Sequence, residues 1–117
     1  MLMFAINFYS ELYEDQLRRG RKTATVRLGD KSAKYQAGQL VWITVGQRFG
    51  RRQKLFTAII DRVEVKIAGD LSPRDIQKEN PEMRTLDDAL DLLSRIYGRT
   101  VSPDDTVSVV YFSAVSE

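Results

Sequence analysis

The chain contains no histidine and no cysteine, which removes most of the side chains that carry enzyme chemistry. A histidine general base, a cysteine nucleophile and the nitrogen and sulfur ligands typical of zinc sites are excluded. The lack of cysteine also excludes a disulfide framework and fits a reducing compartment, so we expect a cytoplasmic protein. Any catalysis must use lysine, threonine, serine, tyrosine and carboxylates, and we expect neither a metal nor another cofactor.

Long apolar runs and charge of one sign are also lacking. No apolar run approaches the ~18 residues of a membrane span, and the first residues lack the cationic region and cleavage site of a signal peptide. We therefore expect no membrane partner. The 18 Lys and Arg against 16 Asp and Glu give a net charge of only +2, so the charge alone does not imply a general affinity for polyanions. At 117 residues, without repeats or a linker, the chain is expected to form one domain over 1–117 and to be a monomer.

The order of strand and helix patterns indicates the fold class. Branched and aromatic residues predict strands over 2–9, 23–28, 39–46, 55–67 and 105–115. Capping signals at Ser10, Ser72 and Thr85 predict three helices: the first over 11–19, the second ending near Glu79 and the third ending at Gly98. Helices inserted after the first strand and before the last favour a small α+β barrel.

Two of these strands carry more specific expectations. The run Q-L-V-W-I-T-V-G over 39–46 is almost continuously apolar, which predicts burial on both faces with Trp42 in the core. A basic hairpin is expected over 47–54. The strand over 55–67 is long enough to bend and to serve two neighbours, with Val63, Val65 and Ile67 on one face.

The segment G-R-K-T-A-T-V-R, residues 20–27, concentrates the residue types that remain available for chemistry. A lysine loses its proton more readily when it is buried, and a threonine hydroxyl becomes nucleophilic with such a base beside it. A regular strand would place Lys22 and Thr25 on opposite faces, so they can meet only if Lys22 lies in the preceding turn. The other interpretation is an edge strand with solvated cations.

The spacing Gly20-x-Lys22-x-x-x-x-Arg27 resembles the G-x-K-x-x-x-x-R signature of ASCH domains, a branch of the PUA-like superfamily. The order of elements is similar from end to end, so the resemblance covers essentially the whole chain. It implies a barrel of about five or six strands with a cleft near the signature turn.

Within that family the chain resembles the small bacterial amidohydrolases that convert N(4)-acetylcytidine and related N(4)-acylated cytosines to cytidine and the acid. Three segments carry this likeness: G-R-K-T-A-T-V-R, R-D-I-Q-K-E-N and L-D-D-A-L-D-L-L-S-R-I-Y. The resemblance implies that Lys22, Thr25 and Glu79 are catalytic; without it, Glu79 is an ordinary surface acid. A hairpin richer in arginine and a longer segment from Tyr97 to Val107 depart from the family and leave the substrate preference open.

The implied chemistry gives Thr25 the role of nucleophile and Lys22 that of base, although direct attack by water remains open. Glu79 either orients Lys22 or binds the cytosine edge. Its charge would raise the pKa of Lys22, so burial must outweigh the ion pair for a base role.

Further residues are candidates for binding, each with a structural alternative. Arg27 either holds substrate or pairs with a carboxylate, and Phe8 or Tyr9 either stacks on the base or belongs to the core and its rim. The hairpin cations Arg48, Arg51 and Arg52 either contact RNA or are solvated. The alternative functions are a non-catalytic RNA-binding module and a ribonuclease. The chain's partners are thus a small acylated cytidine and, in the alternative, RNA.

Overall fold

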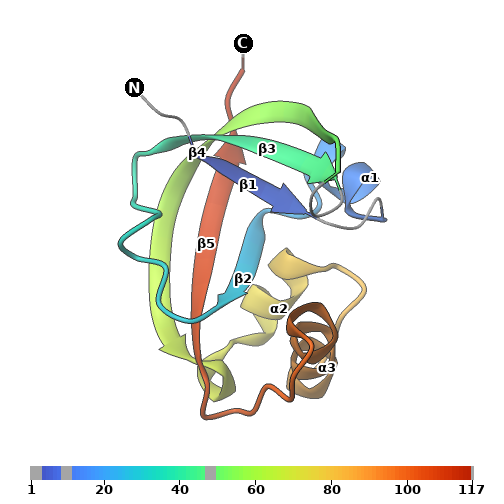
Figure 1. The fold of residues 1–117 in the computed structure, drawn as a ribbon, viewed down its shortest axis with the longest axis vertical. Coiled ribbons are helices and arrows are strands. Elements are labelled where there is room, and N and C mark those ends of the chain that lie inside the picture. The colour runs from blue at the N-terminus through green and yellow to red at the C-terminus, as the bar shows by residue number, and fades with distance from the viewer. Residues whose placement is uncertain (1–3, 9–11, 47–49, 117) are drawn as a thin grey trace.

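The structure is a computed structural model that describes residues 4–8, 12–46 and 50–116 (Figure 1). The fold is mixed α+β, as the sequence predicts. In chain order its elements are β1 (Ala5–Phe8), α1 (Leu12–Arg18), β2 (Ala24–Leu28), β3 (Leu40–Gly46), β4 (Arg52–Ile67), a 3-10 turn (Ala68–Asp70), α2 (Pro73–Glu79), α3 (Leu86–Tyr97) and β5 (Thr106–Ala114).

The strands form one curled, five-stranded sheet in the order β1-β3-β4-β5-β2. The β1–β3 pair is parallel and the other pairs are antiparallel. The first half of β4 pairs with β3 and its second half with β5, with a register shift between Ile60 and Arg62. This long, bent strand confirms the expectation that it serves two neighbours, and it closes the sheet into a half-barrel (Figure 1).

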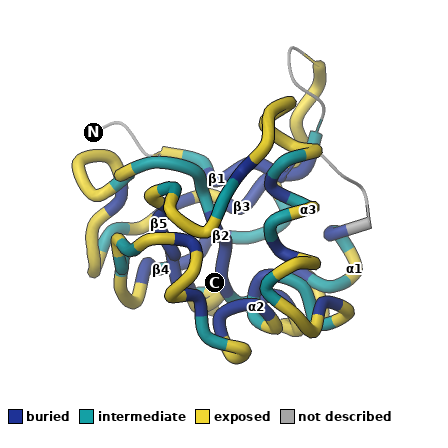
Figure 2. Tube along the Cα trace, turned by 90° about the horizontal axis from the view of Figure 1, so that it is seen from below, coloured by how far each residue is buried: buried dark blue, intermediate teal, exposed yellow. Residues whose placement is uncertain are grey.

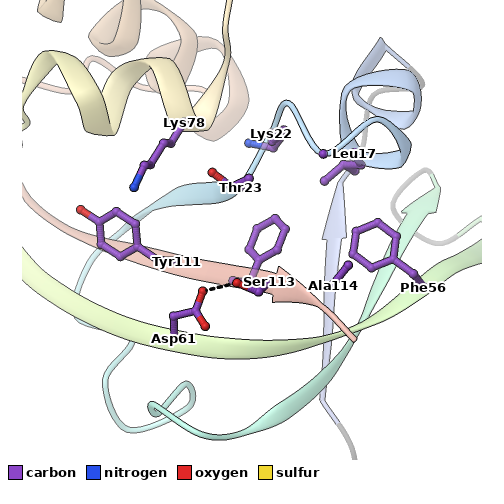
Figure 3. Close-up of a pocket in the computed structure, with 11 residues that line it drawn as sticks. Leu17, Lys22, Thr23, Phe56, Asp61, Lys78, Tyr111, Ser113 and Ala114 are labelled. Atoms are coloured by element: carbon purple, nitrogen blue, oxygen red, sulfur yellow. Dashed lines mark hydrogen bonds between the residues drawn. The ribbon is translucent and has the colours of Figure 1, made fainter. Parts of the chain in front are cut away.

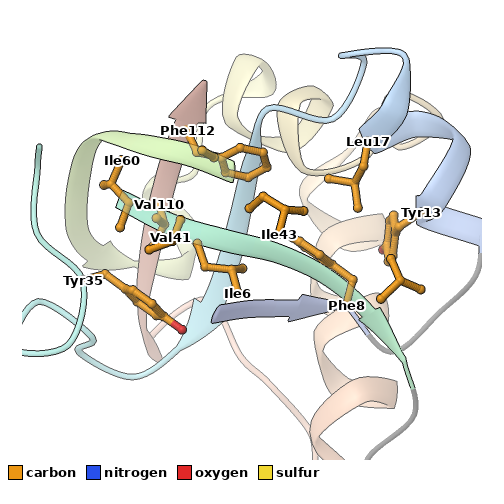
Figure 4. Packing of buried hydrophobic residues seen from close by; sticks show 12 residues of the cluster. Ile6, Phe8, Tyr13, Leu17, Tyr35, Val41, Ile43, Ile60, Val110 and Phe112 are labelled. Carbon is orange, nitrogen blue, oxygen red and sulfur yellow. The ribbon is translucent and has the colours of Figure 1, made fainter. Parts of the chain in front are cut away.

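Two hydrophobic clusters lie on opposite faces of β5, because successive side chains of a strand alternate between its faces. Val110 and Phe112 belong to the first cluster, which fills the concave side of the sheet (Figure 4). Val107, Val109 and Tyr111 belong to the second cluster, to which α2 and α3 also contribute. In Figure 2 the exposed segments gather in the loops and on the outer turns of the helices.

The prediction that β3 is buried on both faces is wrong. Val41 and Ile43 are fully buried, whereas Leu40 and Trp42 are 46% and 43% exposed, so the first half of β3 has one open face. Trp42 is therefore a surface residue and not part of the core. On β4, Val65 and Ile67 alternate with Glu64 and Lys66 as expected, but their apolar side is the more exposed one.

The predicted hairpin is shorter than the sequence pattern indicates. Residues 52–54 already belong to β4, since Arg52 pairs with Gly46 and Lys54 with Thr44. Exposed cations alone do not distinguish a loop from a two-stranded ladder, which explains the error. Among the described helices, none is long and apolar enough to cross a membrane.

Local signals explain where the helices begin and end. Ser72 and Thr85 each accept a hydrogen bond from the backbone N–H three residues later, and Asp75 and Asp88 close the two capping boxes. Gly98 ends α3 in the left-handed conformation. The result that matters for function is that α2 ends at Glu79, directly beside the start of β2.

Candidate active site

Lys22 lies in the turn between α1 and β2. The sequence requires this position if the lysine is to approach Thr25, because within the strand the two side chains would lie on opposite faces. Gly20 has a φ of 70°, which favours glycine, and the backbone N–H groups of Arg21 and Lys22 both donate to the Gln16 carbonyl. This closed turn ends helix α1 and directs the Lys22 side chain inward, where its exposed fraction is 0%.

The ammonium group of Lys22 is held between α2 and β2. Its Nζ lies 3.0 Å from Glu79 Oε1 and donates to the Ala24 carbonyl at 2.9 Å and to the Glu79 carbonyl at 2.5 Å. The rings of Phe8 and Tyr13 flank it, with centroids 4.9 and 4.7 Å from Nζ. The interpretation of segment 20–27 as an edge strand with solvated cations is therefore wrong for Lys22, although β2 does lie at the edge of the sheet.

Glu79 is buried and both of its carboxylate oxygens are engaged. Oε1 faces Lys22, while Oε2 accepts a hydrogen bond from the Val26 N–H at 2.7 Å. The end of α2 is joined to the same strand by the Thr23 N–H, which donates to the Lys78 carbonyl at 3.1 Å. Of the two roles expected for Glu79, this geometry favours orienting Lys22.

Burial lowers the pKa of Lys22 from its ordinary 10.5 to about 8, although the negative charge of Glu79 acts in the opposite direction. Burial thus outweighs the ion pair, as the base role requires. Burial and the charge of Glu79 both raise the pKa of Tyr13 well above its usual range, so Tyr13 stays neutral beside the pair. Lys22 therefore loses its proton closer to neutral pH than a solvated lysine does.

Thr25 and Arg27 share one face of β2, since they are two residues apart in the strand. Thr25 is buried, and its Oγ1 accepts a hydrogen bond from Arg27 Nε at 3.0 Å. The Arg27 guanidinium also donates to the Asn7 carbonyl at 3.0 Å and lies 5.3 Å from the centroid of Phe8. Within the described residues these are its partners, and the carboxylate of the structural alternative is not among them.

Phe8 links the two halves of the site, because its ring contacts both the Lys22 ammonium and the Arg27 guanidinium. It is buried and also packs on Tyr13, with ring centroids 5.9 Å apart. Among the described residues no hydrogen bond joins Lys22 to Thr25 directly. The structure thus brings Lys22 and Glu79 into contact and holds Thr25 nearby through Arg27.

Other predicted residues lie elsewhere. Arg51 and Arg52 are exposed at the start of β4 and are not among the contacts of Lys22 and Glu79. Tyr9 and Arg48 lie outside the described residues.

The sequence did not point to several neighbours of the site. Gln16 Nε2 donates to Asn80 Oδ1 at 3.3 Å, while Gln16 Oε1 is buried without a hydrogen-bond partner among the described residues. Tyr13 would be assigned to the core from its helical spacing to Leu17. Nothing in the pattern of α1 distinguishes these residues from ordinary helix positions.

A hollow of about 370 Å³ borders Lys22 on the outer side of the turn (Figure 3). Lys22, Thr23 and Lys78 line it on one side, and Tyr111, Ser113 and Asp61 on the other (Figure 3). The Ser113 hydroxyl donates to Asp61 at 2.6 Å, and the Tyr111 ring lies 5.2 Å from Lys78 Nζ. Thr25 and Glu79 are not among its lining residues.

Comparison of the sequence with models of protein families and with curated proteins gives no match. Solved structures do match. An ASCH domain from Lactobacillus crispatus has a TM-score of 0.70 at 16% identity, over 96% of this chain and 79% of that one. A protein of Enterococcus faecalis assigned to the family model DUF984 has a TM-score of 0.69 at 22% identity, over 98% of this chain and 82% of that one.

A third structure, the hypothetical protein PH0355, has a TM-score of 0.69 at 13% identity, over 97% of this chain and all of that one. These likenesses extend over the whole chain at low identity, so they define the fold. The chain has the small α+β half-barrel fold of the ASCH domain structure, as the signature spacing implies.

Proposed function

We propose that this protein is a metal-independent amidohydrolase that cleaves the acyl amide of N(4)-acetylcytidine and related N(4)-acylated cytosine nucleosides. The observation that carries the proposal is a fully buried lysine whose pKa is lowered to about 8, held by a carboxylate and close to a threonine–arginine pair. A buried lysine whose pKa is perturbed by desolvation beside a specific charge partner marks a candidate functional site. The family resemblance of segment 20–27 supports the substrate class.

The reaction begins with the neutral form of Lys22. Lys22 Nζ takes the proton of the Thr25 hydroxyl as Thr25 Oγ1 attacks the acyl carbon. The ammonium then donates that proton to the exocyclic nitrogen as the C–N bond breaks and cytidine leaves. Water attacks the acyl-threonine, Lys22 accepts its proton, and the proton returns to Oγ1 as the carboxylic acid departs.

The neighbouring residues support these steps. Arg27 donates to Thr25 Oγ1 in the resting structure, so its positive charge stabilises negative charge on that oxygen during attack and departure. Glu79 holds Lys22 in place through Oε1, and the N–H of Val26 holds Glu79 through Oε2.

The test is hydrolysis of N(4)-acetylcytidine followed by ultraviolet absorbance, because loss of the acyl group changes the spectrum of the base. We expect turnover by the wild-type protein and a loss of at least 1,000-fold in Lys22→Met, roughly the range that a positioned base contributes. Methionine keeps the length of the side chain and its contacts with Phe8 and Tyr13, but it leaves the buried Glu79 carboxylate without its cation, so the fold of the variant is checked by circular dichroism. Thr25→Val, which keeps the shape of threonine, is expected to lose activity to a similar degree.

The matched control is Arg84→Met, which removes a cation from an exposed position outside the site. It should retain wild-type turnover. Near-full activity of Lys22→Met, with a wild-type circular dichroism spectrum, would refute the mechanism. Absence of turnover by the wild-type protein on acetylated and longer-chain acylated cytidines would refute the proposed function.

A further inference from the structure

Charge is unevenly distributed along this nearly neutral chain. Residues 31–60 contain six cations and no acid: Lys31, Lys34, Arg48, Arg51, Arg52 and Lys54. The other 87 residues contain 12 cations and all 16 acids. The excess positive charge is thus concentrated in the segment that includes β3 and the first part of β4.

The pairing of β3 with β4 places two of these cations, Arg52 and Lys54, on one face of the sheet. Trp42, Thr44 and Gly46 share the outer face of β3, and Thr44 and Gly46 lie opposite Lys54 and Arg52. The Lys54 Nζ lies 5.4 Å from the centroid of the Trp42 ring, which confirms that the two side chains share this face. The outer face of the β3–β4 ladder therefore presents an exposed tryptophan beside Lys54, with Arg52 two residues away on the same face of β4.

A second cation–aromatic pair lies beside the first. Phe4 is 41% exposed, and Lys34 Nζ lies 5.7 Å from its ring and 5.2 Å from that of Tyr35. The Trp42 N–H donates to the Phe4 carbonyl at 3.1 Å, so the two pairs are adjacent along the start of β1. The exposed rings of Phe4 and Trp42 thus each lie beside a lysine of the acid-free segment.

We propose that this outer face, comprising Phe4, Lys34, Trp42, Arg52 and Lys54, binds single-stranded RNA. Exposed aromatic rings stack on unpaired bases, and neighbouring cations contact the phosphates between them. Duplex bases are already stacked on one another, so this arrangement suits a single strand. The choice of RNA over DNA rests on the proposed function, whose substrate is a ribonucleoside, whereas single-strand binding rests on the surface alone.

The charge argues against a second copy of the chain as the occupant. Two such faces brought together would place like charges opposite one another, which is unfavourable at an interface. The face also lies on the side of the sheet opposite to the first hydrophobic cluster, since Ile43 points inward and Trp42 outward.

The experiment measures fluorescence anisotropy of a labelled 12-nucleotide oligouridylate with the full chain at 50, 100 and 200 mM salt. We expect binding by the wild-type protein and about tenfold weaker binding by Trp42→Ala, since loss of one stacked base costs ~1–3 kcal/mol. Trp42→Phe keeps an aromatic ring and should recover most of the affinity. Arg52→Ala should reduce the slope of log affinity against log salt by about 0.7, the value for one phosphate contact on a single strand.

Arg74→Ala is the matched control for charge, because Arg74 is an exposed arginine of α2 outside the acid-free segment. It should leave both the affinity and the salt slope unchanged. Equal binding by wild type and Trp42→Ala, tighter binding of duplex RNA, or absence of binding at 50 mM salt would each overturn the proposal. Oligodeoxythymidylate bound as tightly as the RNA would overturn the choice of RNA.

Lys22→Met separates this inference from the proposed hydrolase. We expect it to bind oligouridylate as the wild type does while losing hydrolysis. If the wild-type protein hydrolyses acetylcytidine but shows no Trp42-dependent RNA binding, only this inference fails. If it binds RNA through Trp42 without hydrolysing acylated cytidines, only the single-strand surface stands and the hydrolase proposal fails.

Discussion

At the scale of single residues, the behaviour of Lys22 results from two opposed effects. Removal from water disfavours its charged form, while Glu79 at 3.0 Å favours it. Because burial is the larger effect, the pKa falls to about 8 and both protonation states are accessible close to neutral pH. A base that works by proton transfer is most effective in this range.

The first prediction concerns the pH dependence of hydrolysis. If neutral Lys22 is the base, kcat/KM should rise about tenfold per pH unit below pH 8 and level off above it. In Glu79→Gln the negative charge that raises the lysine pKa is absent, so the rising limb should move to lower pH even if the maximal rate falls. Initial rates between pH 5.5 and 9.5 measure both profiles, and an unmoved limb in Glu79→Gln would exclude Lys22 as the titrating group.

The same pKa shift predicts how stability depends on pH. The unfolded lysine has a pKa of 10.5 and the folded one about 8, so the unfolded state binds more protons between these values. The contribution of Lys22 to the unfolding free energy therefore rises with pH across this window, by roughly 3 kcal/mol at 1.36 kcal/mol per pH unit. This contribution to the unfolding free energy is fully present above pH 10.5 and is lost as the pH falls through the folded pKa of about 8.

Urea denaturation of the wild type and Lys22→Met at pH 7.5, 8.5 and 9.5 measures this contribution. The difference between the two proteins removes the titration of the tyrosines and the other lysines. Stability of the wild type should increase relative to the variant as the pH rises. A constant difference would mean that Lys22 titrates at its ordinary pKa.

Some residues of the site could be predicted and others could not, for physical reasons. The position of Lys22 follows from a Gly-ended turn and its spacing to β2. Glu79 comes from a helix 57 residues away, and only the resemblance indicated that it belongs to the site. Trp42 was wrongly assigned to the core because an apolar run does not reveal that one face of its strand has no cover.

At the scale of elements, α2 has only seven residues and depends on anchors outside itself. Asp75 closes its capping box, forms a short hydrogen bond with the Tyr111 hydroxyl, and accepts from Lys66 Nζ at 3.2 Å. Burial raises the pKa of Asp75, but the hydrogen bonds from Tyr111, Ser72 and Lys66 together bring it below its usual range. The S-P-R-D sequence predicted where α2 starts, whereas the contact with Tyr111 on β5 was not predictable from local sequence.

We therefore expect Asp75→Ala to destabilise the protein by about 2–4 kcal/mol. The buried Tyr111 hydroxyl loses its acceptor, Lys66 loses one of its two carboxylate partners, and the cap is lost. Asp88→Ala provides the matched control, since Asp88 closes the capping box of α3 but is exposed, and its loss should cost about 1 kcal/mol. Thermal and urea unfolding of the two variants measure the difference. Equal losses of unfolding free energy in Asp75→Ala and Asp88→Ala would show that the contact with Tyr111 adds no stability beyond that of the cap.

At the scale of the whole molecule, β5 joins the two hydrophobic clusters. Its side chains alternate between them, so neither cluster can lose its packing without disturbing a strand that the other needs. The sequence predicted five strands and the bend in β4, but not the order of strands in the sheet. Pairing such as that of β1 with β3 is determined by contacts between distant segments, which a local pattern does not contain.

This shared strand predicts a single cooperative unfolding transition. Leu93 of α3 is 3% exposed and belongs to the second cluster, so Leu93→Ala should cost about 2–5 kcal/mol. Trp42, the only tryptophan, lies on β3, which contributes to the first cluster, and its fluorescence reports on that half of the molecule. Because the clusters share β5, we expect tryptophan fluorescence and far-ultraviolet circular dichroism to shift to the same lower midpoint.

Ile96→Ala is the control for this change, because Ile96 lies three residues further along the same helix and is 50% exposed. It should alter the unfolding free energy by less than about 0.5 kcal/mol. If Leu93→Ala instead lowers the circular dichroism midpoint and leaves the tryptophan midpoint unchanged, the helical half unfolds independently. In that case Glu79, at the end of α2, would separate from Lys22 before the rest of the sheet unfolds. Hydrolysis should then disappear at the circular dichroism midpoint, whereas Trp42-dependent RNA binding should persist up to the tryptophan midpoint.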